Sequence, residues 1–272
     1  MKQNRTTFVF LFFLLLTFGL LSVDTSYGAV ESAAKKTELT PELKQNLNNE
    51  VAPALKATVS SAYGKLPLYF IKNDGQLDEK VEYYVKGAGY TIYFTAEGVY
   101  FSLYQTSKPD KPGEIKDSKD AAPEKTEITK REFFNLSLLN SNKKAKITGE
   151  AEQSGKVNYF VGDKSKWRSG VPTFASVLYE EVYKGIDIRF YGKGTTLEYD
   201  VIVKPGADPD KVKFVYEGIK GLRVTENGEL QVGLEEALLV QHRPFIYQEI
   251  DGKREAIDGK FVIESETTYG FK

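Results

Sequence analysis

The sequence predicts an all-β protein, built as one or two antiparallel β-sandwiches after a short helical or coil leader. Three observations lead to this prediction. Many short segments place apolar residues at alternate positions, which is the period of a strand with one buried face. Turn-forming residues separate these segments at intervals of about eight to twelve residues. The 272 residues include 17 tyrosines and 17 phenylalanines besides many valines and isoleucines, and these residue types favour β-sheets.

The first 28 residues have the pattern of a secretory signal peptide. Lys2 and Arg5 precede the uncharged residues 6–23, and the small residues Ser26 and Gly28 stand before a cleavage point at Ala29. The alternative is an uncleaved membrane anchor, because an apolar run of this length can just cross a bilayer. We expect cleavage, and therefore a protein that is secreted or held at the cell surface without a membrane span. The absence of cysteine excludes disulfides and a lipid anchor on an N-terminal cysteine.

The remaining chain divides by composition into three parts. Residues 29–64 are a polar linker with one or two short helices, since Thr40 can cap a helix that Pro41 begins and Pro53 interrupts. Residues 65–150 form a first β-rich subdomain, and residues 151–272 form a second. The first contains a mobile loop at 105–130, where proline, lysine and aspartate replace large apolar residues. The predicted strands cover 66–71, 81–87, 90–95, 99–104, 132–140, 145–150, 156–162, 174–179, both arms of 185–203, 211–218, 221–225, 229–234, 245–250 and 254–263.

Turn positions predict which residues lie opposite each other in two hairpins. A two-residue turn at Glu97-Gly98 places Phe94 opposite Phe101, and sorts apolar from polar residues onto separate faces. A turn at Asp251-Gly252 places Glu249 opposite Arg254.

Residues 185–203 raise the question of a metal site. With a turn at Lys193-Gly194, Ile188 faces Tyr199, Arg189 faces Glu198, and Asp187 faces Asp200. Two opposed carboxylates repel each other, so Asp187 and Asp200 form a candidate metal site for Ca²⁺, the one cofactor that the sequence suggests. The alternative is an ordinary solvated sheet face, on which Arg189 lies between the two acids. We favour this alternative.

Four tyrosines fall on the strand face opposite the predicted core. Tyr84, Tyr93, Tyr100 and Tyr104 could stack on sugars or form a protein interface, and they are candidates for a ligand face. The alternative is that the rings brace neighbouring strands, or are covered by the linker or a second sheet. We favour the second interpretation.

No catalytic residue can be assigned from the sequence. His242 is the only histidine, and "VQHRPF" places no serine or acid where a catalytic triad would need one. Trp167, the only tryptophan, is expected in the core. The net charge of −1 and the lack of a basic helix argue against nucleic-acid binding.

Four motifs carry a resemblance to a known family. They are "LPLYFIKNDGQ" (66–76), "NYFVGDKSKW" (158–167), "VYKGIDIRFYGKGTTLEYDVIVKPGADPDKV" (182–212) and "PFIYQEIDGK" (244–253). Over roughly residues 66–264 the chain resembles the N-terminal domain of unknown function in large bacterial secreted proteins, where it precedes SBBP (seven-bladed β-propeller) repeats. The resemblance implies a bacterial, exported, β-rich module of cell-surface proteins. It implies no reaction and transfers no catalytic residues.

This sequence also differs from the proteins that it resembles. Such proteins usually continue into a closing strand and then the repeats, whereas this sequence stops at Lys272. We therefore expect a stand-alone module, or a truncated fragment of a propeller-containing surface protein with an unpaired sheet edge. Taken together, the sequence predicts a non-enzymatic structural or interaction module whose partner is a protein or glycan at the cell surface. The alternatives are a carbohydrate-active envelope enzyme, a glycan-binding module and a pure spacer.

Overall fold

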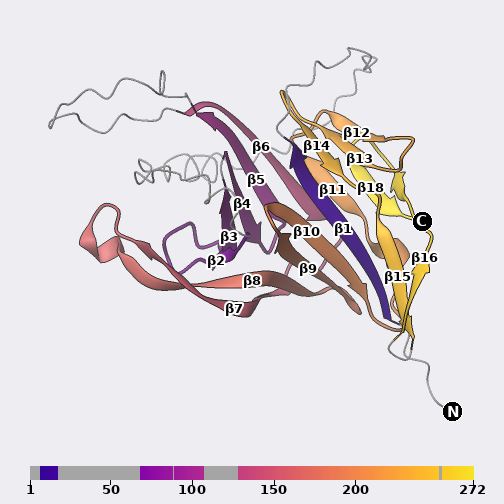
Figure 1. Cartoon of the computed structure of the whole chain (residues 1–272), viewed down its shortest axis with the longest axis horizontal. Coiled ribbons are helices and arrows are strands. Elements are labelled where there is room, and N and C mark those ends of the chain that lie inside the picture. The colour runs from indigo at the N-terminus through magenta and orange to yellow at the C-terminus, as the bar shows by residue number, and fades with distance from the viewer. Residues whose placement is uncertain (1–6, 18–67, 88, 107–127, 251–252) are drawn as a thin grey trace.

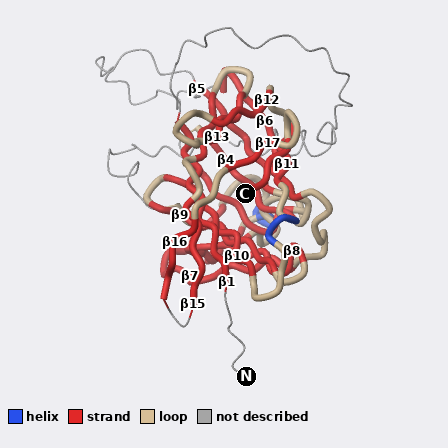
Figure 2. Tube along the Cα trace, turned by 90° about the vertical axis from the view of Figure 1, so that its right-hand side faces the viewer, coloured by secondary structure: helices blue, strands red, loops and turns tan. Residues whose placement is uncertain are grey.

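The computed structural model describes residues 7–17, 68–87, 89–106, 128–250 and 253–272. Their regular secondary structure is almost entirely antiparallel β-strand, which confirms the predicted all-β class, as the strand colour of Figure 2 shows. The predicted helices of the linker at 29–64 and most of the predicted loop at 105–130 lie outside the described residues. Within them, no helix has the length and apolar character needed to cross a membrane.

The described strands join in one 18-stranded network. In the first half these are β1 (Thr7–Thr17), β2 (Phe70–Lys72), β3 (Val81–Gly87), β4 (Tyr90–Thr95), β5 (Val99–Thr106), β6 (Ile128–Leu138), β7 (Lys146–Tyr159), β8 (Arg168–Tyr183) and β9 (Ile186–Lys193). The second half contains β10 (Thr196–Val203), β11 (Phe214–Glu217), β12 (Gly221–Val224), β13 (Leu230–Gly233), β14 (Leu238–Gln241), β15 (Phe245–Ile250), β16 (Lys253–Ile257), β17 (Phe261–Ile263) and β18 (Thr268–Phe271). Two 3₁₀ turns, η2 (Lys164–Lys166) and η3 (Pro209–Lys211), complete the described elements.

Two antiparallel layers enclose the core. One layer is the meander β2–β3–β4–β5–β6, which continues through β11 to β18 and β17. The other runs through β9 and β10 to β1, and then to β14 and β15 (Figure 1). Strand β8 connects the layers, because it pairs with β2 near Phe174 and with β9 from Ser176 onwards. The prediction of a sandwich therefore describes this arrangement well.

Aromatic side chains fill the space between the layers. Phe94 contacts Phe190, which packs on Tyr199, and Tyr199 in turn contacts Phe214. The main cluster of buried residues includes side chains from Phe70 to Tyr269. The expected boundary between residues 150 and 151 lies inside strand β7, and residues on both sides of it share this core.

Strand β1 occupies the middle of the second layer. Its residues pair with β10 on one side and with β14 and β15 on the other (Figure 1). It belongs to the segment expected to be a signal peptide, whose removal on export stays a prediction. The rest of the predicted signal peptide lies outside the described residues.

The β4–β5 hairpin confirms the predicted faces, but its strands pair in a different register from the predicted one. Phe94 lies opposite Val99, and Phe101 lies opposite Ile92, so the register differs from the prediction by two residues. Glu249 does lie opposite Arg254, as predicted, and their side chains form an ion pair at 3.5 Å. A shift by two residues keeps each side chain on its face, which is why the buried faces are still those predicted.

Candidate functional site

The candidate metal pair, Asp187 and Asp200, is not formed as predicted. Across the β9–β10 hairpin, Asp187 lies opposite Ile202 and Asp200 lies opposite Arg189. The turn consists of Gly194 and Thr195, one residue later than predicted, and Gly194 has a φ of 60°. Among two-residue hairpin turns, the type II′ turn has a positive φ at its first central position only, which favours glycine there. The predicted turn would have put Lys193 there instead.

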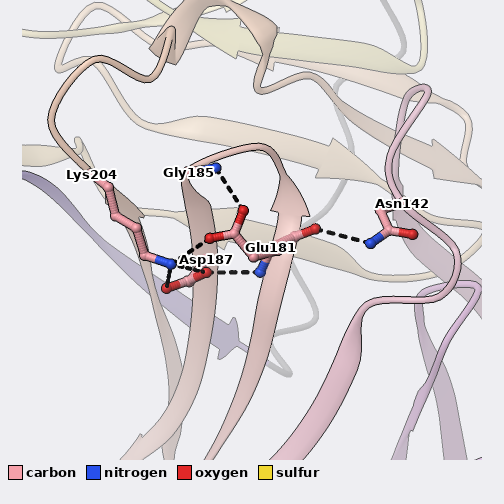
Figure 3. Close-up of polar contacts among 5 residues, drawn as sticks. All are labelled: Asn142, Glu181, Gly185, Asp187 and Lys204. Atoms are coloured by element: carbon pink, nitrogen blue, oxygen red, sulfur yellow. Dashed lines mark hydrogen bonds and ion pairs between the residues drawn. The ribbon is translucent and has the colours of Figure 1, made fainter.

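The charge of the Asp187 carboxylate is balanced by a lysine (Figure 3). Its carboxylate accepts a hydrogen bond from the backbone N–H of Glu181 at 2.8 Å and lies 3.0 Å from Nζ of Lys204. The Glu181 carboxylate binds the same Nζ at 2.6 Å and accepts the Gly185 N–H at 2.8 Å. Within the described chain, no three histidine, aspartate or glutamate side chains lie close enough together to hold a metal ion.

These contacts stabilise a strained irregularity near the end of β8, where the pairing with β9 shifts between Tyr179 and Tyr183. Glu181 has a φ of 54°, an unusual conformation for a residue other than glycine. The Gly185 N–H, followed by the ammonium of Lys204, lowers the pKa of Glu181. In turn, the carboxylate of Glu181 raises the pKa of Lys204. Asn142 donates a hydrogen bond to the Glu181 carbonyl at 3.2 Å. The cluster thus acts as a brace for a turn.

Asp200 lies in a different environment, on the face of β10 that points away from the core. Burial raises its pKa to about 6, although it accepts a hydrogen bond from the Tyr191 hydroxyl at 3.0 Å. Burial also raises the pKa of Glu198, whose carboxylate lies 3.8 Å from Nζ of Lys193. Arg189 is held by Glu150, with Nε 2.7 Å from a carboxylate oxygen. A carboxyl group with a pKa near 6 can exchange protons near neutral pH, which is the chemistry that this cluster offers.

The tyrosine face is largely covered. Tyr84, Tyr93 and Tyr100 do lie opposite the main core, as predicted, but their exposed fractions are 0%, 7% and 8%. They form a second apolar cluster with residues of β7 and β8, among them Val171 and Tyr159. The Tyr84 hydroxyl donates a hydrogen bond to that of Tyr159. The candidate ligand face is therefore wrong for these three tyrosines, which are buried instead of open to a ligand.

Tyr104 is the fourth ring of the candidate face and remains partly exposed. Its hydroxyl lies 3.4 Å from the carbonyl oxygen of Gly87, and burial raises its pKa. Tyr104 is therefore the one member of the candidate ligand face whose side chain is still partly exposed.

An exposed aromatic group lies instead at the end of the β7–β8 hairpin, which reaches away from the other strands in Figure 1. Phe160, Val161 and Trp167 are 58%, 51% and 40% exposed, and the two rings meet edge to face at 5.2 Å. Nζ of Lys164 lies 5.8 Å from the centre of the Trp167 ring. We call Phe160, Val161, Lys164 and Trp167 the hairpin tip. It combines exposed aromatic rings, a residue class enriched in binding surfaces, with a lysine ammonium beside one of the rings.

Local contacts give the hairpin tip a defined shape. Asp163 caps η2 by accepting the Ser165 N–H at 2.8 Å, and the Trp167 indole donates to the Gly162 carbonyl at 3.3 Å. Arg168 ties the tip to the β2–β3 loop through the Asp74 carbonyl at 2.7 Å. The expectation that Trp167 lies in the core was wrong. The polar turn "GDKSK" between Val161 and Trp167 was the signal for an exposed loop.

A small cavity lies between the layers. Its volume is about 30 Å³, room for about one water molecule, and its walls include Val99, Leu136, Tyr179 and Phe190. These mainly apolar walls make it a packing defect of the core.

A family model described as "Domain of unknown function (DUF7948)" matches residues 70–272. The chain belongs to this family. The match spans the β9–β10 hairpin and the hairpin tip of this chain. No curated protein and no solved structure matched the chain.

Proposed function

We propose that this DUF7948 protein is an exported, non-enzymatic interaction module of a bacterial cell surface. The observation that carries the proposal is the hairpin tip, where two aromatic side chains and a lysine are exposed on the far end of the β7–β8 hairpin. The signal-peptide pattern of residues 1–28 and the resemblance to domains that precede SBBP repeats support the cellular location.

Apolar exposure at the hairpin tip is costly unless something covers it. Phe160 and Trp167 each leave at least two fifths of their surface in water, while most of the other aromatic rings in the described part of the chain whose burial is known lie in the interior. Binding to a protein or glycan would bury these faces, and aromatic rings contribute strongly to such interfaces. Lys164 adds a positive charge beside the ring, which suits an anionic or sugar-rich surface.

The sole tryptophan provides the test. Because Trp167 is at the hairpin tip, its fluorescence reports on that site alone. We expect a blue shift and saturable binding when the protein is titrated with purified bacterial cell-wall sacculi or with the extracted surface-protein layer. An emission spectrum unchanged by both preparations would argue against the tip as the binding site.

Two variants distinguish specific binding at the hairpin tip from non-specific adhesion. Phe160→Ser removes the ring that contacts Trp167 but keeps the reporter, and we expect it to weaken binding by roughly tenfold, the range of an interface hot spot. Phe245→Ser removes a ring that is 50% exposed elsewhere, on β15, and should leave binding unchanged. Equal losses in both variants would indicate non-specific adhesion.

A glycan-related role is the second candidate, because a tryptophan face can stack on sugar rings. The same samples distinguish the alternatives. Binding to sacculi without release of soluble sugar would indicate a glycan-binding module. Steady release of reducing sugar that stops in Asp200→Asn would indicate a carbohydrate-active enzyme using the carboxyl group whose pKa is raised to about 6.

A further inference from the structure

Strand β1 combines two features that conflict in an exported protein. Residues 7–17 lie in the uncharged run that follows Lys2 and Arg5, where a signal peptide has its apolar centre. The same residues form a strand in the middle of a sheet layer. If export removes residues 1–28, as proposed above, the folded protein loses this strand.

The backbone pairing of β1 is extensive on both sides. Along one edge, Phe8 to Leu14 pair with Val203 to Leu197 of β10. Along the other edge, Thr7 to Leu11 pair with Glu249 to Phe245 of β15, and Leu14 to Thr17 pair with Gln241 to Leu238 of β14. Without β1, the facing edges of three strands lose their partners (Figure 1).

These edges belong to the core of the protein. Leu197, Tyr199, Val201 and Val203 of β10 are at most 1% exposed. Across the gap, Leu239 and Gln241 of β14 have no exposed surface. Unpaired backbone N–H and C=O groups beside buried apolar residues are unfavourable and attract another strand.

We propose that the space of β1, between β10 and the β14–β15 edge, is a strand-acceptor slot in the exported protein. It binds an extended segment of a partner polypeptide by β-strand addition along both edges. The pairing length calls for a segment of about eleven residues, the span of β1. Because both edges need backbone N–H groups, the segment is free of proline, and its neighbours in the core favour uncharged, β-branched or aromatic residues.

Two stretches of this sequence outside the described strands fit the slot poorly, which favours a partner segment over them. Residues 105–130 are rich in proline, lysine and aspartate. In the linker, the most apolar stretch is 51–59, which contains Pro53 and Lys56. A second copy would have lost the same N-terminal residues.

The test uses the full chain, expressed with its own N-terminus in a bacterial host and recovered from the exported fraction. Its intact mass locates the mature N-terminus, which we expect at Ala29. Amide hydrogen exchange is then measured with and without a synthetic TFVFLFFLLLT peptide that carries a lysine tail for solubility. We expect β10 amides to exchange about tenfold faster or more without the peptide than with it. The β3–β4 amides, far from the slot, serve as the internal control and should not change.

A control peptide tests whether protection of β10 depends on strand pairing. The same peptide with proline in place of Phe10 and Phe13 should fail to protect β10. Should the exported protein not fold alone, recovery of cooperative unfolding with the first peptide, but not the second, would equally support the slot.

Three results would overturn the proposal. They are an exported protein that retains residues 7–17, full protection of β10 without peptide, and equal effects of both peptides. None of these bears on Trp167 fluorescence, so a failure of the slot and a failure of the hairpin tip can be told apart.

Discussion

Nε2 of Gln241 lies 2.8 Å from the hydroxyl oxygen of Tyr216, and both side chains are completely buried. Gln241 also accepts the Tyr199 hydroxyl at 2.9 Å and donates to Tyr269 at 3.1 Å. One amide thereby joins β14 to tyrosines of β10, β11 and β18, which come from both layers. Burial raises the pKa of all three tyrosines well above the usual value, so they remain neutral donors and acceptors.

Replacing Gln241 with leucine should destabilise the protein. The substitution leaves buried hydroxyls without their amide partner, and we expect a loss of about 2–4 kcal/mol in the free energy of unfolding. Chemical denaturation monitored by circular dichroism measures this. Gln248→Leu is the matched control, because the hydrogen bond from Gln248 to Glu255 is exposed, and it should change stability by less than about 0.5 kcal/mol. Similar losses in both variants would contradict a special role for the buried network.

Asp200 should make the protein less stable at neutral pH than at mildly acidic pH. Its pKa rises from 3.8 to about 6 on folding, so the folded state binds the proton more tightly than the unfolded state. The contribution of Asp200 to stability is therefore fully present below pH 3.8 and is lost as the pH rises through about 6. It amounts to at most about 2 kcal/mol once solvent screening is allowed for.

The variant Asp200→Asn isolates this contribution. Asparagine keeps an acceptor for the Tyr191 hydroxyl but cannot ionise, so at pH 8 we expect the variant to be more stable than the wild type. Near pH 4 the two should agree. Denaturant unfolding at both pH values provides the comparison, and a difference independent of pH would show that Asp200 does not titrate as described. The Glu150, Asp163 and Glu181 carboxyl groups, whose pKa values are lowered, act in the opposite sense but are common to both proteins.

Calcium should not stabilise the β9–β10 hairpin. Asp187 already has Lys204 at 3.0 Å and a backbone donor, which leaves no uncompensated pair of acids to attract a cation. We expect equal melting temperatures in Ca²⁺ and in EDTA, since only a ligand of the folded state raises the midpoint. An increase with Ca²⁺ that disappears in Asp187→Asn would revive the metal site.

Gly218, after β11, should not tolerate a side chain. Its φ is +81°, and an added Cβ would lie 2.8 Å from the carbonyl oxygen of Phe133. We expect Gly218→Ala to lower the free energy of unfolding by about 2 kcal/mol or more. Gly155→Ala in β7 is the control, because no heavy atom lies within 4 Å of its Cβ position, and its effect should be small. The thermal midpoints of the two variants measure the difference, and equal midpoints would contradict the close approach.

The β9–β10 hairpin illustrates how far sequence patterns reach. Alternation correctly placed Ile188, Phe190, Leu197 and Tyr199 on the buried face. It did not determine which of them are opposite, because a shift of two residues preserves the alternation. The pairing depends on the turn, and a glycine between two polar residues allows more than one turn. That ambiguity led to the predicted opposition of Asp187 and Asp200, which the observed pairing corrects.

The surface was harder to predict than the core. Tyr84 and Trp167 are both aromatic residues in segments that also carry charged residues, yet the first is buried and the second is 40% exposed. The difference arises because β7 and β8 cover the outer face of β3 and β4, while the end of their own hairpin extends beyond it. Such coverage depends on contacts between segments far apart in the sequence, which local patterns do not contain.

The sequence by itself determined the all-β class, the buried faces and the register of the β15–β16 hairpin, because alternation and turn residues act within a few positions of one another. Only the tertiary structure decided that Lys204 neutralises Asp187, that Gln241 joins both layers, and that residues 7–17 lie between β10 and β15. Each of these depends on long-range pairing of strands. Many registers satisfy the same alternation, and the packing of the whole core selects among them.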